Sequence, residues 1–199
     1  MDKTIFVNLA KLFEKHGYAL YMVGGTSRDF LLGREVLDYD FVTDATPFEM
    51  KAFLEQADYT FEKYGTVRVV YHHQKIDIVT LRQEGEYIDF RHPKNIHYVR
   101  DLKLDYVRRD FTINAIYIDK FFNVIDYADG LSDLKDGIIR FIGEPEKRVI
   151  EDPLRILRAE RFAKKLGFII EEKTRAAIEK HRHLLAKLNP DKVREEQNK

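Results

Sequence analysis

Two aspartates separated by one residue, Asp38 and Asp40, are the side chains of this 199-residue chain best suited to hold a divalent cation. Aromatic and β-branched neighbours predict a strand over residues 37–43, and the period of two along a strand sends both carboxylates to one face. Like charges there repel unless a cation compensates them, and Mg²⁺ suits carboxylates shared with substrate phosphates. The pattern also occurs on solvated strand faces, so the neighbouring segments must show whether these two aspartates bind a metal.

A glycine pair precedes the two aspartates. An apolar run ends at Gly24 and Gly25, after which Thr26 or Ser27 is expected to cap a short helix. Gly25 lets backbone N–H groups approach a phosphate, and the helix end adds partial positive charge. Arg28 can donate a charge-assisted pair of hydrogen bonds to the same phosphate. Neither a P-loop nor a GxGxxG fingerprint is present. The combination predicts a seat for a metal-bound triphosphate, and hence nucleotidyl transfer.

Helices and strands that could position these residues are predicted by apolar spacing. Residues 5–15 have a helical pattern, and Pro47 begins another helix after the strand predicted over residues 37–43. Residues 65–71 and 75–81 read as a hairpin around a turn at residues 72–74, where two histidines are expected to be solvated. These elements predict an α/β (α+β) fold with a mixed sheet and flanking helices.

The pattern changes after residue 140. Residues 145–187 show helical spacing with few strand signals, so we place a domain boundary near Gly143. The predicted domains are a catalytic head over residues 1–142 and an all-helical neck over residues 143–199.

Composition is that of a folded protein without cysteine: 44% of the residues are hydrophobic and 34% are charged. Thirty-four basic residues balance 34 acidic ones, and the neck is slightly basic, with 15 against 11 from residue 141 onward. A basic surplus is common in nucleic-acid-binding proteins, so the slight basic excess of the neck within a neutral chain is only weak support for a nucleic-acid partner. No signal peptide or membrane-spanning segment is evident, and we expect a cytoplasmic location, no membrane contact and no obligate protein partner.

Four segments carry a resemblance to a known family. Residues 23–33 (VGGTSRDFLLG), 38–43 (DYDFVT), 108–115 (RRDFTINA) and 151–163 (EDPLRILRAERFA) together resemble the motifs of class II tRNA nucleotidyltransferases, the CCA-adding enzymes. Bacterial poly(A) polymerases share them. The resemblance runs from about residue 18 to the end of the chain.

The resemblance implies a head of the DNA polymerase β-like nucleotidyltransferase type that adds C and A from CTP and ATP to the 3′ end of tRNA with Mg²⁺. It assigns metal binding and catalysis to Asp38 and Asp40. It also implies that Arg109 contacts the nucleotide, with Asn114 as a weaker candidate.

The segment that begins at Glu151 is expected to choose the base. Pro153 at a helix start places Asp152 near the N-terminus, and Arg155 follows one turn later. Asp accepts hydrogen bonds from an exocyclic amine and Arg donates to ring nitrogens or carbonyls, so the pair can read C and A. Two more arginines at spacings of three are expected toward the triphosphate: Arg158 and Arg161. The alternative is an amphipathic helix with solvated arginines.

Other segments have open or structural roles. Asp77, in the second arm of the hairpin, is either a third carboxylate that takes the proton of the attacking hydroxyl or an ordinary edge-strand residue. Residues 82–93 resemble the flexible loop of full CCA-adding enzymes, which CC-only relatives shorten. Residues 126–134 resemble a family element that links head to neck, with Asp129 where the family has glycine.

Several functions use the same head. A poly(A) polymerase would add only A, CC-adding or A-adding relatives would add part of the triplet, and a non-catalytic nucleotide-binding module would add nothing. The family's body and tail domains have no counterpart in the sequence, so we expect either a truncated or a minimal form.

Overall fold

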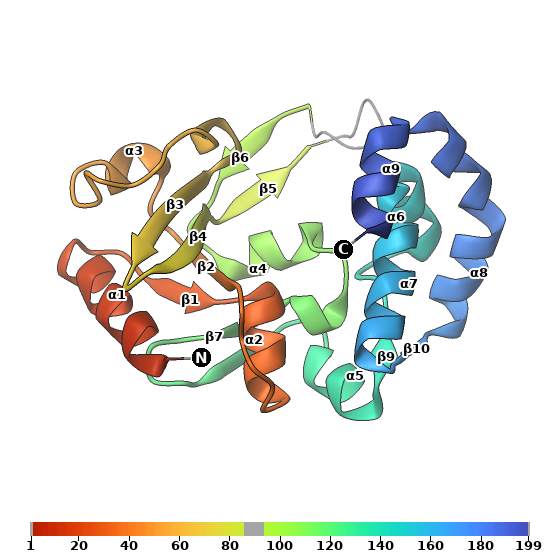
Figure 1. The fold of residues 1–199 in the computed structure, drawn as a ribbon, viewed down its shortest axis with the longest axis horizontal. Coiled ribbons are helices and arrows are strands. Elements are labelled where there is room, and N and C mark those ends of the chain that lie inside the picture. Colours follow the sequence, from red (N-terminus) through yellow and green to blue (C-terminus); the bar gives the residue numbers. More distant parts are fainter. Residues whose placement is uncertain (1, 86–93, 199) are drawn as a thin grey trace. The chain divides into compact units, whose positions relative to one another are not determined.

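The computed structural model describes residues 2–85 and 94–198, and the chain divides into two compact units (Figure 1). Unit 1 comprises Met1–Gln83, Ile96–Tyr106 and Asn114–Tyr127. Unit 2 comprises Glu84–Asn95, Val107–Ile113 and Ala128–Lys199. Unit 2 thus takes in segments that precede residue 143, and the division into a head and a neck at that residue stays a prediction.

The helices, strands and 3₁₀ helices (η) follow one another along the chain as α1 Lys3–Lys15, β1 Leu20–Met22, α2 Gly24–Leu31, β2 Tyr39–Thr43, α3 Pro47–Met50, η1 Glu62–Tyr64, β3 Thr66–Tyr71, β4 Gln74–Thr80, β5 Arg82–Glu84, β6 Ile96–Tyr98, α4 Leu102–Asp105, η2 Tyr106–Arg108, η3 Thr112–Asn114, β7 Ile116–Ile118, β8 Val124–Asp126, α5 Gly130–Asp136, β9 Ile138–Ile139, α6 Pro145–Glu151, α7 Leu154–Leu166, β10 Ile169–Ile170, α8 Glu172–His181, η4 Arg182–Lys187 and α9 Pro190–Gln197. None of the helices in the described ranges has the length and apolarity needed to cross a membrane.

Unit 1 is built on a six-stranded mixed sheet with the order β3-β4-β2-β1-β7-β8, which confirms the predicted fold class. Strands β2 and β4 run parallel, whereas β1 pairs antiparallel with both β2 and β7. The predicted hairpin is confirmed as β3 and β4. His72 and His73 form its turn with φ angles of 47° and 65°, the left-handed values that tight hairpin turns require.

One face of this sheet is covered by the predicted first helix, α1. Its Phe6 and Phe13 are fully buried and belong to one cluster with Met22, Phe41 and Ile78 of the strands. Full burial of such a side chain contributes about 1.5–3 kcal/mol, so this face holds the sheet together.

The opposite face of the sheet carries the residues that alternate with that core. Val42 and Val79 pack there with Leu102 of α4 and Tyr117 of β7. Because side chains two residues apart share a face, Asp40 lies on this second face beside Val42.

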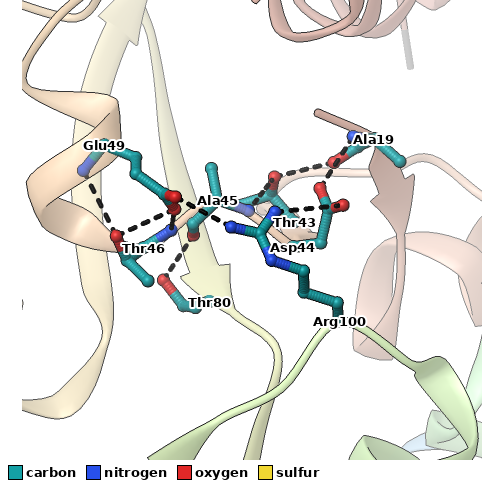
Figure 2. A network of polar contacts seen from close by, with 8 residues as sticks. All are labelled: Ala19, Thr43, Asp44, Ala45, Thr46, Glu49, Thr80 and Arg100. Carbon is teal, nitrogen blue, oxygen red and sulfur yellow. Dashed lines mark hydrogen bonds and ion pairs between the residues drawn. The ribbon is translucent and has the colours of Figure 1, made fainter. Parts of the chain in front are cut away.

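Beyond the carboxyl end of β2, helix α3 begins as predicted with Pro47 in its first turn. Thr46 and Glu49 form a capping box, in which each side chain satisfies a backbone N–H of the other. Arg100 donates to Glu49 at 2.8 Å and also approaches Asp44, so this end of β2 is tied to the segment that follows β6 (Figure 2).

The predicted loop at residues 82–93 is only partly described. Residues 82–84 form β5, which pairs with β6, so the interpretation of residues 82–93 as a flexible loop is wrong for its first three residues. Residues 86–93 lie outside the described residues, and the expected flexible loop is therefore not tested there.

Unit 2 contains the helices α5 to α9 and one short parallel pair of strands, β9 and β10, which the sequence did not predict. Asp129 precedes α5 with φ 55° and ψ 29°. Asp tolerates this left-handed conformation better than most residues, so it can stand where the family has glycine.

Candidate active site

The glycine turn and the second aspartate of the predicted site meet in unit 1. Gly24 has a φ of +64°, and a Cβ added there would lie 3.5 Å from Oδ2 of Asp40. A Cβ on Gly25 would lie 3.8 Å from the same oxygen and 3.6 Å from Nη2 of Arg28. The turn, the carboxylate and the guanidinium therefore form one site, in which the glycines let the backbone pass close to the charged groups.

Helix α2 begins earlier than predicted. Its first residue is Gly24 and its N-cap is Val23, so the prediction that Thr26 or Ser27 caps the helix is wrong. Both hydroxyls lie inside the first turn and are fully buried. That of Thr26 donates to the backbone carbonyl of Asp38 at 2.9 Å and accepts from the N–H of Asp40 at 2.6 Å. No local pattern in the sequence indicates this contact beyond the presence of a hydroxyl.

Arg28 is held in a fixed orientation. Its side chain is buried, and Nε and Nη2 each donate to one oxygen of Asp29 at 2.9 Å. Nη1 donates at 2.9 Å to Oδ1 of Asn114, which the sequence had suggested as a nucleotide contact. Arg28 thus brings positive charge to the glycine turn with its direction set in advance.

The two aspartates differ in their surroundings. Strand β2 begins at Tyr39, so Asp38 lies in a bend just before the strand and is exposed, while Asp40 lies within it and is half-buried. The prediction that both lie on the strand is therefore wrong for Asp38. Its place is nonetheless fixed through the contact of its carbonyl with Thr26.

Asp77 lies beside Asp40 on the neighbouring parallel strand, since the two residues are partners in the register of β2 and β4. Side chains in register share a face of the sheet. Asp77 also accepts from Nε and Nη2 of Arg68 at 2.6 and 2.9 Å. This pair raises the pKa of Arg68. Within the described ranges no three His, Asp or Glu side chains gather closely enough to hold an ion.

In unit 2, the predicted base-selecting residues lie where α6 ends and α7 begins. Asp152 is the C-cap of α6, and its Oδ1 accepts from the N–H of Leu154 at 3.1 Å. Arg155, the second residue of α7, is buried, and its Nη1 donates to Oε2 of Glu151 at 3.0 Å and to the carbonyl of Arg148 at 2.8 Å. The arginine is therefore not a solvated surface residue.

Arg148 is a functional candidate that the sequence reasoning missed. Its Nη2 donates at 2.7 Å to the carbonyls of both Arg108 and Arg109, and its Nη1 donates to Glu151 at 2.6 Å. Arg148 thereby ties the segment of the predicted nucleotide ligand Arg109 to the segment that carries Arg155. The spacings of three and four residues around Glu151 could have indicated this network.

The two remaining arginines of α7 are ion-paired. Arg158 donates from Nε to Asp110 at 2.8 Å, and the Asp110 charge raises the pKa of Arg158. Arg161 donates to the buried carboxylate of Glu196 in α9 at 2.8 Å. Each arginine thus has a carboxylate partner within unit 2, which their predicted contact with a triphosphate did not anticipate.

The structure thus gathers the predicted site residues in two sets. Asp40, Gly25 and Arg28 lie together in unit 1, and the backbone of Asp38 is connected to them through Thr26. The second set lies in unit 2: Arg109, Asp152, Arg155, Arg158 and Arg161.

Comparison with protein families finds two matches. Residues 20–140 match the model described as the poly A polymerase head domain. Residues 167–199 match the model described as the probable RNA and SrmB-binding site of polymerase A.

Individual proteins are similar over nearly the whole chain. The CCA-adding enzyme of Lactobacillus johnsonii is 42% identical over 193 residues, which are 97% of this chain and 48% of that enzyme. A crystal structure of the Bacillus stearothermophilus CCA-adding enzyme in complex with CTP has a TM-score of 0.90 at 34% identity, covering 98% of this chain and 48% of that one. The Thermotoga maritima CCA-adding enzyme complexed with tRNA has a TM-score of 0.79 at 30% identity, covering 97% and 45%. The chain thus spans about half the length of these relatives.

Proposed function

Because the chain belongs to the family of the poly A polymerase head domain, we propose that it is a template-independent nucleotidyltransferase that adds C and A from CTP and ATP to the 3′ end of tRNA. The observation that carries the proposal is the approach of Asp40 to the Gly24–Gly25 turn beside Arg28. Relatives that match nearly all of this chain are CCA-adding enzymes, and one was solved with CTP.

We propose Asp38 and Asp40 as the ligands of Mg²⁺. The fit rests on the donor set, since both groups are carboxylates, the hard oxygen donors that Mg²⁺ prefers. The glycine turn next to Asp40 leaves room that a Cβ would fill. When bound, Mg²⁺ supplies positive charge to a transferring phosphoryl group and makes a hydroxyl more nucleophilic.

The residues of unit 1 are proposed to bind the triphosphate. The N-terminus of α2 presents backbone N–H groups at the glycine turn, where Gly25 allows close approach. Arg28 adds a charge whose direction Asp29 and Asn114 fix in advance. In the reaction, the 3′-hydroxyl oxygen of the RNA loses its proton to water or a carboxylate and bonds to the α-phosphorus. The bond from that phosphorus to the bridging oxygen breaks, and pyrophosphate leaves.

The residues of unit 2 are proposed to select the base. Asp152 can accept a hydrogen bond from the amino group of C or A, and Arg155 can donate to the ring acceptor beside it. The contacts of Arg155 with Glu151 and the Arg148 carbonyl orient its guanidinium before a nucleotide arrives. Arg109, Arg158 and Arg161 are proposed as further nucleotide contacts. For Arg158 and Arg161 this requires the nucleotide to share or replace their present carboxylate partners.

Poly(A) polymerase is the second candidate function, and the description of the matched head domain favours it. It would use the same carboxylates and glycine turn but add only A. As part of the CCA-adding function, we propose that the protein acts in the cytoplasm and that its partners are tRNA, CTP and ATP.

The product sequence tests the proposal. The 199-residue chain is incubated with Mg²⁺, CTP and ATP and with a tRNA that ends before CCA, and the products are sequenced. We expect the 3′ end to gain C, C and A and then stop. A run of A would favour poly(A) polymerase, two C residues alone would indicate a CC-adding enzyme, and an A added only to an RNA that already ends in CC would indicate an A-adding enzyme. Binding of CTP without any extension would indicate a nucleotide-binding module.

A further inference from the structure

The side chain of Thr26 continues the hydrogen-bond ladder of β2 beyond the end of β1. Strand β1 pairs with β2 as far as Met22 and Phe41, and the N–H of Val23 then donates to the Asp40 carbonyl at 3.2 Å. After this point the chain turns into α2 and supplies no further strand. The Thr26 hydroxyl, in the first turn of that helix, takes over by bonding the N–H of Asp40 and the carbonyl of Asp38.

A single oxygen atom therefore binds the backbone of both aspartates. Its one proton goes to Asp38 at 2.9 Å, and it accepts the Asp40 N–H at 2.6 Å. The side chain is fully buried, so water does not compete for either contact. Since the two bonded groups flank Tyr39, the hydroxyl fixes the backbone between the two carboxylates.

The other neighbour of β2 does not provide the same support. The parallel register with β4 starts at Tyr39 and Ile76, so Asp38 lies outside it. Asp38 is also exposed and precedes the strand. Its carbonyl accepts instead from Thr26 of α2, which links the glycine turn to the spacing of the carboxylates.

We propose that Thr26 is a positioning residue that sets the distance between the Asp38 and Asp40 carboxylates and thereby the affinity of the site for a divalent cation. The proposal rests on the proposed function of these carboxylates as metal ligands. The Thr26 hydroxyl is fully buried and bonded to the backbone of Asp38 and Asp40, so its loss acts through the two aspartates. Loss of a group that orients metal ligands typically weakens metal affinity about 10- to 100-fold.

The same strand offers a matched control. Thr43, at the opposite end of β2, is also fully buried, and its hydroxyl donates to the Ala19 carbonyl at 2.7 Å and accepts from the N–H of Ala45 at 3.1 Å (Figure 2). Thr43→Val thus removes a hydroxyl with the same burial and the same two kinds of partner, at the end of β2 away from the aspartates.

The test measures binding of Mn²⁺, which accepts the same oxygen ligands and is visible by electron paramagnetic resonance. The parental chain, Thr26→Val, Thr26→Ser and Thr43→Val are titrated after circular dichroism has shown that each is folded. We expect Thr26→Val to bind Mn²⁺ about 10- to 100-fold more weakly. Thr26→Ser keeps the hydroxyl and should bind nearly as the parent does. Thr43→Val should melt at a lower temperature yet keep the parental affinity.

Three results would overturn the inference. Parental affinity in a folded Thr26→Val chain would show that the hydroxyl does not matter for the metal, and an equal loss in Thr43→Val would show a general effect of lost stability. If Thr26→Val fails to fold, Thr26→Ser decides, because weak binding by the folded serine variant would contradict the role of the hydroxyl. If the parental chain incorporates CMP and Thr26→Val binds Mn²⁺ with the parental affinity, only this inference is refuted. If the parental chain binds no Mn²⁺, the proposed metal site is refuted as well.

Discussion

At the scale of residues, most of the predicted charged side chains are already engaged by protein partners. Arg28 is bound by Asp29 and Asn114, and Arg155 is bound by Glu151. Such contacts lower the entropic cost of presenting a guanidinium to a ligand, because its direction is set before binding. We therefore expect a single substitution of Arg28 or Arg155 to have a larger effect on nucleotide binding and selection than the loss of a mobile surface charge would.

Replacing Arg155 with alanine tests base selection. Without the guanidinium, the hydrogen bonds that favour C and A over U are lost, and we expect discrimination against UTP to fall by about 1–3 kcal/mol. The measurement is the ratio of kcat/KM for CTP to that for UTP. Arg175→Ala, which removes an exposed arginine of α8 in the same unit, is the control and should leave the ratio unchanged. Unchanged rejection of UTP by Arg155→Ala would contradict the selecting role.

At the scale of elements, local spacing predicted what lies within one segment and missed what depends on distant ones. The helix α1, the hairpin of β3 and β4 and the capped start of α3 follow from apolar period and turn residues. The partners of Arg158 and Arg161 lie 48 and 35 residues away in the sequence, and no local pattern encodes them. Thr26 illustrates the same limit, because its hydroxyl is used by a strand rather than by its own helix.

The pairing of β2 with β4 gives a prediction for Asp77. We expect Asp77→Asn to reduce incorporation more than Arg68→Met does, because the carboxylate lies in register with Asp40 whereas the arginine serves mainly to pair with it. The ion pair is partly exposed, so its loss should cost at most about 1 kcal/mol of stability. The measurement is kcat for both variants, with melting temperatures alongside. Equal effects on kcat would assign Asp77 to the ion pair alone.

The connection between Arg100 and α3 gives a prediction about pH. Burial acts to raise the pKa of Glu49, but hydrogen bonds from Thr46 and the charge of Arg100 together hold it below its ordinary value of 4.5. A lowered carboxyl pKa contributes stability above the unfolded value and loses it as the pH falls through the folded value. We therefore expect Arg100→Met to melt below the parent at pH 7, and the difference to shrink as the pH is lowered below 4.5. A difference that is the same at pH 7 and pH 3 would contradict this role of Glu49.

At the scale of the whole molecule, the chain carries two sets of residues on two compact units and covers about half the length of its CCA-adding relatives. The neutral net charge sets it apart from many nucleic-acid-binding proteins. In the proposed function, chemistry and base selection depend on residues that this chain contains. We therefore expect the 199-residue chain to carry out nucleotide addition when RNA is supplied at saturating concentration.

The proposed nucleotidyl transfer is tested most directly by incorporation of labelled CMP from CTP into a saturating tRNA acceptor that ends before CCA, with Mg²⁺. The parental chain should label the RNA, and Asp40→Asn, which removes one negative charge and little volume, should lower the rate at least about 100-fold. Circular dichroism should show that the variant keeps the parental fold. A parental chain that leaves the acceptor unlabelled, or a folded Asp40→Asn chain that labels it at the parental rate, would contradict the proposed function.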